Sequence, residues 1–192
     1  MKFLAKHEQS PIIAQGLTYR VDGKNAKLTE ALWQEQSGFC AYSEAFLRPI
    51  DQGEIDHFDP RLKNKPEDHY GNWYLIYAKL NRKKKRDIKR FLPILTPSSA
   101  ELTQRIRYED GIFQPVDLND TEAKNLINFL GMNDEYLVEY RQNHVERLKE
   151  IRTRCGPDEE FIAYLTKPKH RAELSFITAL EHELNLSLSH LI

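Results

Sequence analysis

The sequence predicts an α+β fold, in which a small strand–strand–helix unit is followed by a mostly helical region. Two segments, 53–58 and 73–77, are predicted strands, and the basic segment 78–90 directly after them is a predicted helix. In the second half of the chain the apolar residues recur at helical spacing. Prolines between the two parts mark a boundary, so we expect one unit over 1–95 and another over 96–192.

The first unit is expected to begin with a helix that precedes the two strands. Residues 27–36 carry an apolar stripe at helical spacing, and Gly38 is the predicted stop. Residues 39–47 are expected to form a hairpin-like segment that ends before Pro49. The strands and the basic helix then complete this unit.

The second unit is expected to start with a hairpin and to continue as four helices. The hairpin covers 105–115 and turns at Asp110-Gly111. The helices are expected from a cap at Asn119 or Asp120 to Gly131, from a cap near Asn133 to before Gly156, from a cap at Asp158 through Leu165, and from beyond Pro168 through Leu184.

Residue types that suit a one-metal nuclease are gathered within about thirty residues of the first unit: Asp56, His57, Asn72, Asn81 and Lys84. Asp56 and Asn81 offer the oxygen ligands that Mg²⁺ and Mn²⁺ prefer. His57 follows Asp56 on a strand, so its side chain points to the other face. It can take a proton from water because its ordinary pKa is about 6.5. Lys84 is expected near the same helix face as Asn81, where it can touch phosphate.

The order of these residues resembles a known nuclease motif. Asp-His-hydrophobe-x-Pro, then Asn72, then Asn-x-x-Lys is similar to the HNH (ββα-metal) motif, with Asn81 in place of the last His. A longer similarity, from Phe39 to Asn133, resembles the PtuB-like HNH proteins. Those are the nuclease partners of an ATPase in Septu-type and retron-linked anti-phage systems.

This resemblance implies a ββα-metal HNH nuclease core in residues 1–95 and a partner-binding region in 96–192. It implies that Asn72 belongs to the catalytic site and pins the loop that carries His57 by side-chain hydrogen bonds. It also implies DNA as the substrate. The expected protein partner is an ATPase of the PtuA kind, which delivers or licenses the nuclease.

PtuB-like proteins often carry two Cys-x-x-Cys pairs that hold a structural zinc, and this chain departs from that pattern. The corresponding positions are Cys40 and Ser43 in the first pair and Tyr77 and Leu80 in the second. A tetrahedral structural site needs four nitrogen or sulfur ligands. We therefore expect no structural zinc, with Tyr77 and Leu80 filling the volume by apolar packing.

The two halves of the chain differ in charge. Residues 1–100 carry 17 Lys and Arg against 12 Asp and Glu, whereas residues 101–192 carry 11 against 17. A basic run beside the motif is the expected nucleic-acid-binding surface, although such runs are usually solvated helix faces; it comprises Lys79, Arg82, Lys83, Lys84, Lys85 and Arg86. The acidic half is expected to bind the protein partner, with Leu188 and Leu191 as exposed apolar residues near the end of the chain.

Composition narrows the class of protein. The sequence has no apolar run near the roughly 18 residues that a membrane span needs, and its first residues lack the apolar core of a signal peptide. Its two cysteines, Cys40 and Cys155, do not indicate a disulfide framework. We expect a cytoplasmic protein that does not contact a membrane.

Two classes of function follow from this sequence. The first is a metal-dependent HNH endonuclease that hydrolyses phosphodiester bonds of DNA, with Mg²⁺ or Mn²⁺ as cofactor, as the effector of an anti-phage defence complex. The alternative is a non-catalytic DNA-binding or adaptor module with a degenerate HNH fold. Asp56, His57, Asn72 and Asn81 together favour the first, because a non-catalytic module has no physical need for all four. A site-specific restriction or homing enzyme would need a base-reading domain, and none is visible.

Overall fold

The structure is a computed structural model that describes residues 1–48, 50–51, 53–85 and 87–192, and of Lys83 the backbone alone. In this part of the chain the α-helices are α1 (Pro11–Ala14), α2 (Ala26–Glu35), α3 (Ala78–Lys83), α4 (Leu102–Arg105), α5 (Thr121–Leu130), α6 (Glu135–Cys155), α7 (Asp158–Leu165) and α8 (Ile177–Leu184). The strands are β1 (Gly53–His57), β2 (Trp73–Tyr77), β3 (Ile106–Glu109) and β4 (Ile112–Pro115). Short 3₁₀ segments lie at Tyr70–Asn72, Ile88–Phe91, Pro168–Leu174 and Ser189–Leu191.

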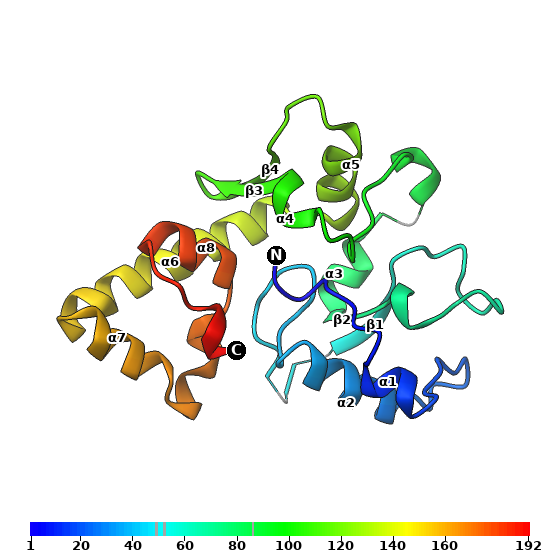
Figure 1. The fold of residues 1–192 in the computed structure, drawn as a ribbon, viewed down its shortest axis with the longest axis horizontal. Helices are drawn as coiled ribbons and strands as arrows, with labels where there is room; N and C mark the ends of the chain where they lie inside the picture. Colours follow the sequence, from blue (N-terminus) through cyan, green and yellow to red (C-terminus); the bar gives the residue numbers. More distant parts are fainter. Residues whose placement is uncertain (49, 52, 86) are drawn as a thin grey trace.

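The elements form an α+β fold, as predicted (Figure 1). Helices α6, α7 and α8 gather on one side, and α1, α2 and the β1–β2 sheet lie on the other. The β3–β4 hairpin and α5 lie across the top of the view. Within the described residues, none of the helices has the length and apolar character that crossing a membrane requires.

The predicted strand–strand–helix unit is present in the first half. Strands β1 and β2 pair antiparallel, with Gly53 opposite Tyr77 and His57 opposite Trp73, and α3 starts at the residue after β2. The predicted helix 78–90 is too long, because α3 ends at Lys83 and the backbone of the next residue is extended with ψ 139°.

Residues before β1 brace this unit, and the helix and hairpin expected there are confirmed. Phe39 bridges Phe46 in the hairpin. Gly38 has φ 82°, and a Cβ there would lie 2.9 Å from the Phe46 ring, so both the backbone angle and the space require glycine. The buried Gln36 side chain donates to the Leu75 carbonyl and accepts from the Leu75 N–H, at 2.8 and 2.9 Å, which joins α2 to β2.

The second half contains the predicted hairpin and helices, with one break. Helix α5 begins where Asp120 accepts the Ala123 N–H at 3.0 Å and ends at Gly131, whose φ is 65°. The last predicted helix is divided, because Phe176 takes a left-handed backbone with φ 59° and donates its N–H to the Glu44 carbonyl at 2.9 Å. A contact with the first half thus sets where α8 begins.

The two halves share one hydrophobic core and several polar contacts. The Glu44 carboxylate is buried and accepts the Thr178 N–H at 3.0 Å and its hydroxyl at 2.7 Å. Leu188 is fully buried in the same core, so the prediction that it is an exposed apolar residue is wrong. Leu191 is only partly buried, and its carbonyl accepts a hydrogen bond from Arg171 at 2.6 Å.

Candidate active site

The residues that the sequence proposes for metal binding and proton transfer line one pocket. Asp56 and His57 come from the end of β1, and Asn81 comes from α3. The pocket has a volume of about 310 Å³, and its remaining walls are Ile55, Pro60, Lys63, Lys84 and Lys85. The β1–β2–α3 unit therefore brings together residues that are 25 positions apart in the sequence.

Asp56 is buried and makes two short polar contacts. Its Oδ2 accepts a hydrogen bond from the Tyr42 hydroxyl at 2.6 Å and lies 2.5 Å from Lys84 Nζ. Burial, and then the charge of Asp56, raise the pKa of Tyr42 well above its ordinary value. Tyr42 consequently keeps its proton and remains a donor to this carboxylate.

Lys84 does not lie on the surface, which corrects its expected role as an exposed phosphate contact. Its side chain is 5% exposed, and Nζ donates to Asp56 Oδ2, to the His57 carbonyl at 2.7 Å and to the Phe58 carbonyl at 3.2 Å. Burial lowers the pKa of Lys84, whereas the charge of Asp56 raises it. The chain leaves α3 at the point where this side chain turns inward.

His57 is held between a carboxylate and an aromatic ring. Its Nε2 lies 2.9 Å from Asp68 Oδ2, in an orientation that is off the direction of a hydrogen bond. Its ring meets the Tyr19 ring edge-on, with centroids 4.5 Å apart. Burial lowers the pKa of His57 below its ordinary value, and the nearby charge of Asp68 opposes that shift. His57 is therefore neutral at neutral pH, the form that can accept a proton.

Asn72 makes side-chain hydrogen bonds across the loop that follows His57. Its Oδ1 accepts the Asp59 N–H at 2.7 Å, and its Nδ2 donates to Asp68 Oδ1 at 2.9 Å. Trp73 Nε1 donates to the same oxygen at 2.9 Å. Asn72 thus holds Asp68 so that its second oxygen faces His57. The sequence suggested the contact with the loop but missed Asp68, because an acidic residue in a polar loop carries no distinguishing signal.

Asn81 is oriented by a carboxylate on the neighbouring strand. Its amide Nδ2 donates to Glu54 Oε2 at 2.9 Å, so its carbonyl oxygen is the end that can bind a cation. Described residues include no group of three or more His, Cys, Asp or Glu side chains that could hold a metal ion. A divalent cation here would depend on Asp56, the Asn81 amide and backbone carbonyls, which are hard oxygen ligands of the kind that Mg²⁺ and Mn²⁺ accept.

The positions that resemble a zinc site hold a single thiol. Cys40 is buried, and burial raises the pKa of its thiol. The Tyr77 hydroxyl donates to the Phe46 carbonyl at 2.7 Å, so this side chain does more than fill space with apolar packing. Leu80 packs against the hydrophobic core.

The predicted basic surface is only partly as expected. Lys79, Arg82 and Lys85 are exposed, whereas Lys84 is enclosed in the pocket. The Lys83 side chain and Arg86 lie outside the described residues. Lys63, which was not predicted, is exposed and contributes to the wall of the active-site pocket.

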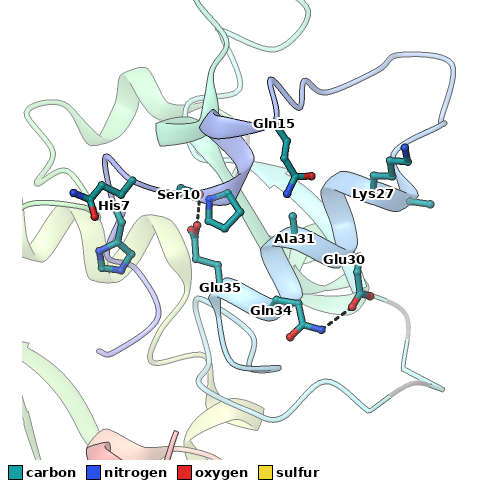
Figure 2. Close-up of a pocket in the computed structure, with 11 residues that line it drawn as sticks. His7, Ser10, Gln15, Lys27, Glu30, Ala31, Gln34 and Glu35 are labelled. Carbon is teal, nitrogen blue, oxygen red and sulfur yellow. Dashed lines mark hydrogen bonds between the residues drawn. The ribbon is translucent and has the colours of Figure 1, made fainter.

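A larger pocket of about 1140 Å³ lies between α1 and α2 (Figure 2). Figure 2 shows Ser10 and Glu35 joined by a hydrogen bond at one side of this pocket, and Gln34 joined to Glu30 at another. Glu35 also accepts a hydrogen bond from Tyr70 at 2.5 Å. We place the candidate active site in the smaller pocket because that pocket holds the histidine, the carboxylate and the amide of the predicted motif.

Comparison of the chain with family models, with curated proteins and with solved structures gives no match. The assignment of a function therefore depends on the residues of the pocket and on the motif.

Proposed function

We propose that this protein is a metal-dependent HNH endonuclease that hydrolyses phosphodiester bonds of DNA. The observation that supports it best is that the buried His57, whose pKa is lowered by burial, lies in the same pocket as Asp56 and Asn81. A nuclease needs a base that takes a proton from water and a cation that stabilises the negative charge at the phosphate. In this pocket His57 can act as the base, and Asp56 and Asn81 can bind the cation.

In this proposal His57 takes a proton from the attacking water. Asp68 orients the imidazole of His57. Asn72 in turn fixes Asp68 and the loop between His57 and Asp68. Asp56 and Asn81 would hold Mg²⁺ or Mn²⁺. When bound, such an ion supplies Lewis-acid stabilisation of the leaving oxygen.

Positive side chains at the pocket support nucleic acid as the substrate. Lys63 and Lys85 are exposed and line the pocket, and Lys79 and Arg82 are exposed on α3. Cations in such an arrangement attract the phosphate backbone without reading the bases. The charge difference between the halves supports the further proposal that the acidic half binds a protein, which by the motif resemblance is a PtuA-like ATPase in an anti-phage defence complex.

A nicking assay on supercoiled plasmid tests the reaction. We expect Mg²⁺-dependent nicking that EDTA stops and added Mg²⁺ restores, and we expect His57→Ala to lower the rate by about 10²- to 10⁴-fold because the base is removed. His69→Ala is the matched control, since His69 is an exposed histidine next to the same loop. Equal rates for the parent and His57→Ala would show that His57 is not the base.

One observation favours the alternative, a non-catalytic DNA-binding or adaptor module. The Asp56 carboxylate is already neutralised by Lys84 at 2.5 Å. A protein of this kind would bind DNA but would not nick it, whatever the concentration of Mg²⁺ or Mn²⁺. The same assay, run with a DNA-binding measurement, separates the two functions.

A further inference from the structure

The ammonium group of Lys84 is surrounded by oxygen atoms that accept hydrogen bonds from it. One carboxylate oxygen of Asp56 and the backbone carbonyls of His57 and Phe58 lie 2.5, 2.7 and 3.2 Å from its Nζ. The Phe129 ring lies 5.0 Å from the same nitrogen and the Tyr42 ring 5.8 Å, which adds attraction from their π faces. The ammonium is enclosed on several sides and its side chain is 5% exposed.

The atoms around Lys84 Nζ are those that a hard metal ion would use. Carboxylate and carbonyl oxygens are the usual ligands of Mg²⁺, and among the described residues Asp56 is the carboxylate on the wall of this pocket. A divalent cation and an ammonium repel each other, and in a partly buried site solvent screens that repulsion weakly. The two cations therefore cannot both bind Asp56 at full strength.

The structure also offers Lys84 another position. Lys84 also lines a second pocket, of about 260 Å³. The opposite wall of this second pocket is the C-terminal end of α5, residues 127–131. The last carbonyl groups of a helix carry a partial negative charge and attract cations. Lys84 is the C-cap of α3: its N–H donates to the Leu80 carbonyl at 2.8 Å, so its backbone position is fixed between the two pockets. A rotation about its side-chain bonds is then enough to carry the ammonium from one pocket to the other.

We propose that the Lys84 ammonium occupies the cation-binding position beside Asp56 and that a divalent cation binds Asp56 only after the ammonium has moved away from this carboxylate. This inference rests on the proposed nuclease function and adds how its metal affinity is set. Lys84 lowers that affinity, and its removal strengthens metal binding.

Direct measurement of Mn²⁺ binding by electron paramagnetic resonance and calorimetry, without DNA, tests the competition. We expect Lys84→Met, an unbranched neutral side chain, to bind Mn²⁺ at least about tenfold more tightly than the parent protein. Lys85→Met is the matched control: it removes one positive charge from the same pocket, but from an exposed side chain, and we expect a change within about twofold. Asp56→Asn should abolish this binding in the parent and in the Lys84→Met background.

Because removal of Lys84 also takes away the ion-pair partner of Asp56, a second measurement uses the unaltered protein. Acetylation of lysine side chains, followed by mass spectrometry, reports which ammonium groups reach solvent. We expect Mn²⁺ to raise the modification rate of Lys84 by about tenfold and to leave the rate of Lys24, an exposed lysine in the loop before α2, unchanged.

The outcomes separate this inference from the proposed function. Asp56-dependent Mn²⁺ binding that is equal or weaker in Lys84→Met, or an unchanged Lys84 modification rate when Mn²⁺ is bound, would overturn the inference and leave the metal site standing. Absence of Asp56-dependent binding in every variant would overturn both.

Discussion

Buried polar residues in the two halves of this molecule have different partners. In the first half, His57 and Asp56 face other charged side chains and a pocket. In the second half, His144 lies 3.0 Å from the Glu173 carbonyl and 3.3 Å from the Arg147 guanidinium. The Arg141 guanidinium donates to the Met132 carbonyl at 2.7 Å.

Burial alone does not distinguish these groups. Burial lowers the pKa of His57 and of His144 alike, and Arg141 is even less exposed than Asp56. Arg141 donates to the Gly111 and Met132 carbonyls, which do not titrate, and it therefore holds the backbone of the second half in place. Side chains that face one another across a pocket can exchange protons and bind ions, and for this reason the first half is the candidate for chemistry.

Replacing each of the two buried histidines by glutamine tests this comparison. We expect a large effect on cleavage from one variant and an effect on stability from the other. We expect His57→Gln to lower cleavage by about 10²- to 10⁴-fold with little change in stability. We expect His144→Gln to lower the free energy of unfolding by about 1–3 kcal/mol and to leave cleavage per folded molecule unchanged. Plasmid nicking and urea denaturation of both variants measure this. Loss of cleavage in the His144 variant at equal stability would contradict it.

A charge at Leu188 tests whether the end of the chain belongs to the core of the second half. Leu188→Asp should lower the free energy of unfolding by about 4 kcal/mol, because it removes a fully buried side chain and buries a carboxylate without a partner. Ile112→Asp, at a 38% exposed residue of β4, is the control and should cost less than about 1 kcal/mol. A Leu188→Asp protein that unfolds like the parent would show that this leucine is exposed in solution.

The smallest expected effect sharpens the role of Asp68. Asp68→Asn removes a charge that raises the pKa of His57, so that pKa should fall further below its ordinary value. Because His57 acts as a base only when neutral, the acidic limb of the pH–rate profile should move to lower pH. The rate at neutral pH should fall by about tenfold through poorer orientation of the ring. A pH profile that does not move would show that Asp68 has no electrostatic effect on His57.

Much of the fold followed from the sequence because local signals and tertiary packing agree. Strand β2 has the predicted bounds, and α5 begins after Asp120, one of its two predicted caps, and ends at Gly131 as predicted. Helix α7 ends at the predicted Leu165, but Asp158 is its first residue and Pro157, not Asp158, is its cap. The predictions failed where a distant contact decides the backbone. Lys84 turns inward to Asp56 and ends α3, and the bond from Phe176 to Glu44 divides the last predicted helix.

The site was predicted less completely than the fold. Asp56, His57 and Asn81 could be found because their spacing matches a motif, and the structure brings them to one pocket. Asp68 and Tyr42 could not, because each meets its partner only after the loops have folded. The direction of Lys84 could not be predicted either, since its neighbours in the sequence are also basic and a basic run usually faces solvent.

The side-chain amide of Asn72 links the two ends of the loop after His57. Asn72 binds the backbone of Asp59 at one end and the carboxylate of Asp68 at the other, and most of residues 60–67 are exposed. With both ends fixed, doubling the length of such a loop costs only about 0.6 kcal/mol of closure entropy. We therefore expect this segment to accept designed insertions while the histidine stays in place.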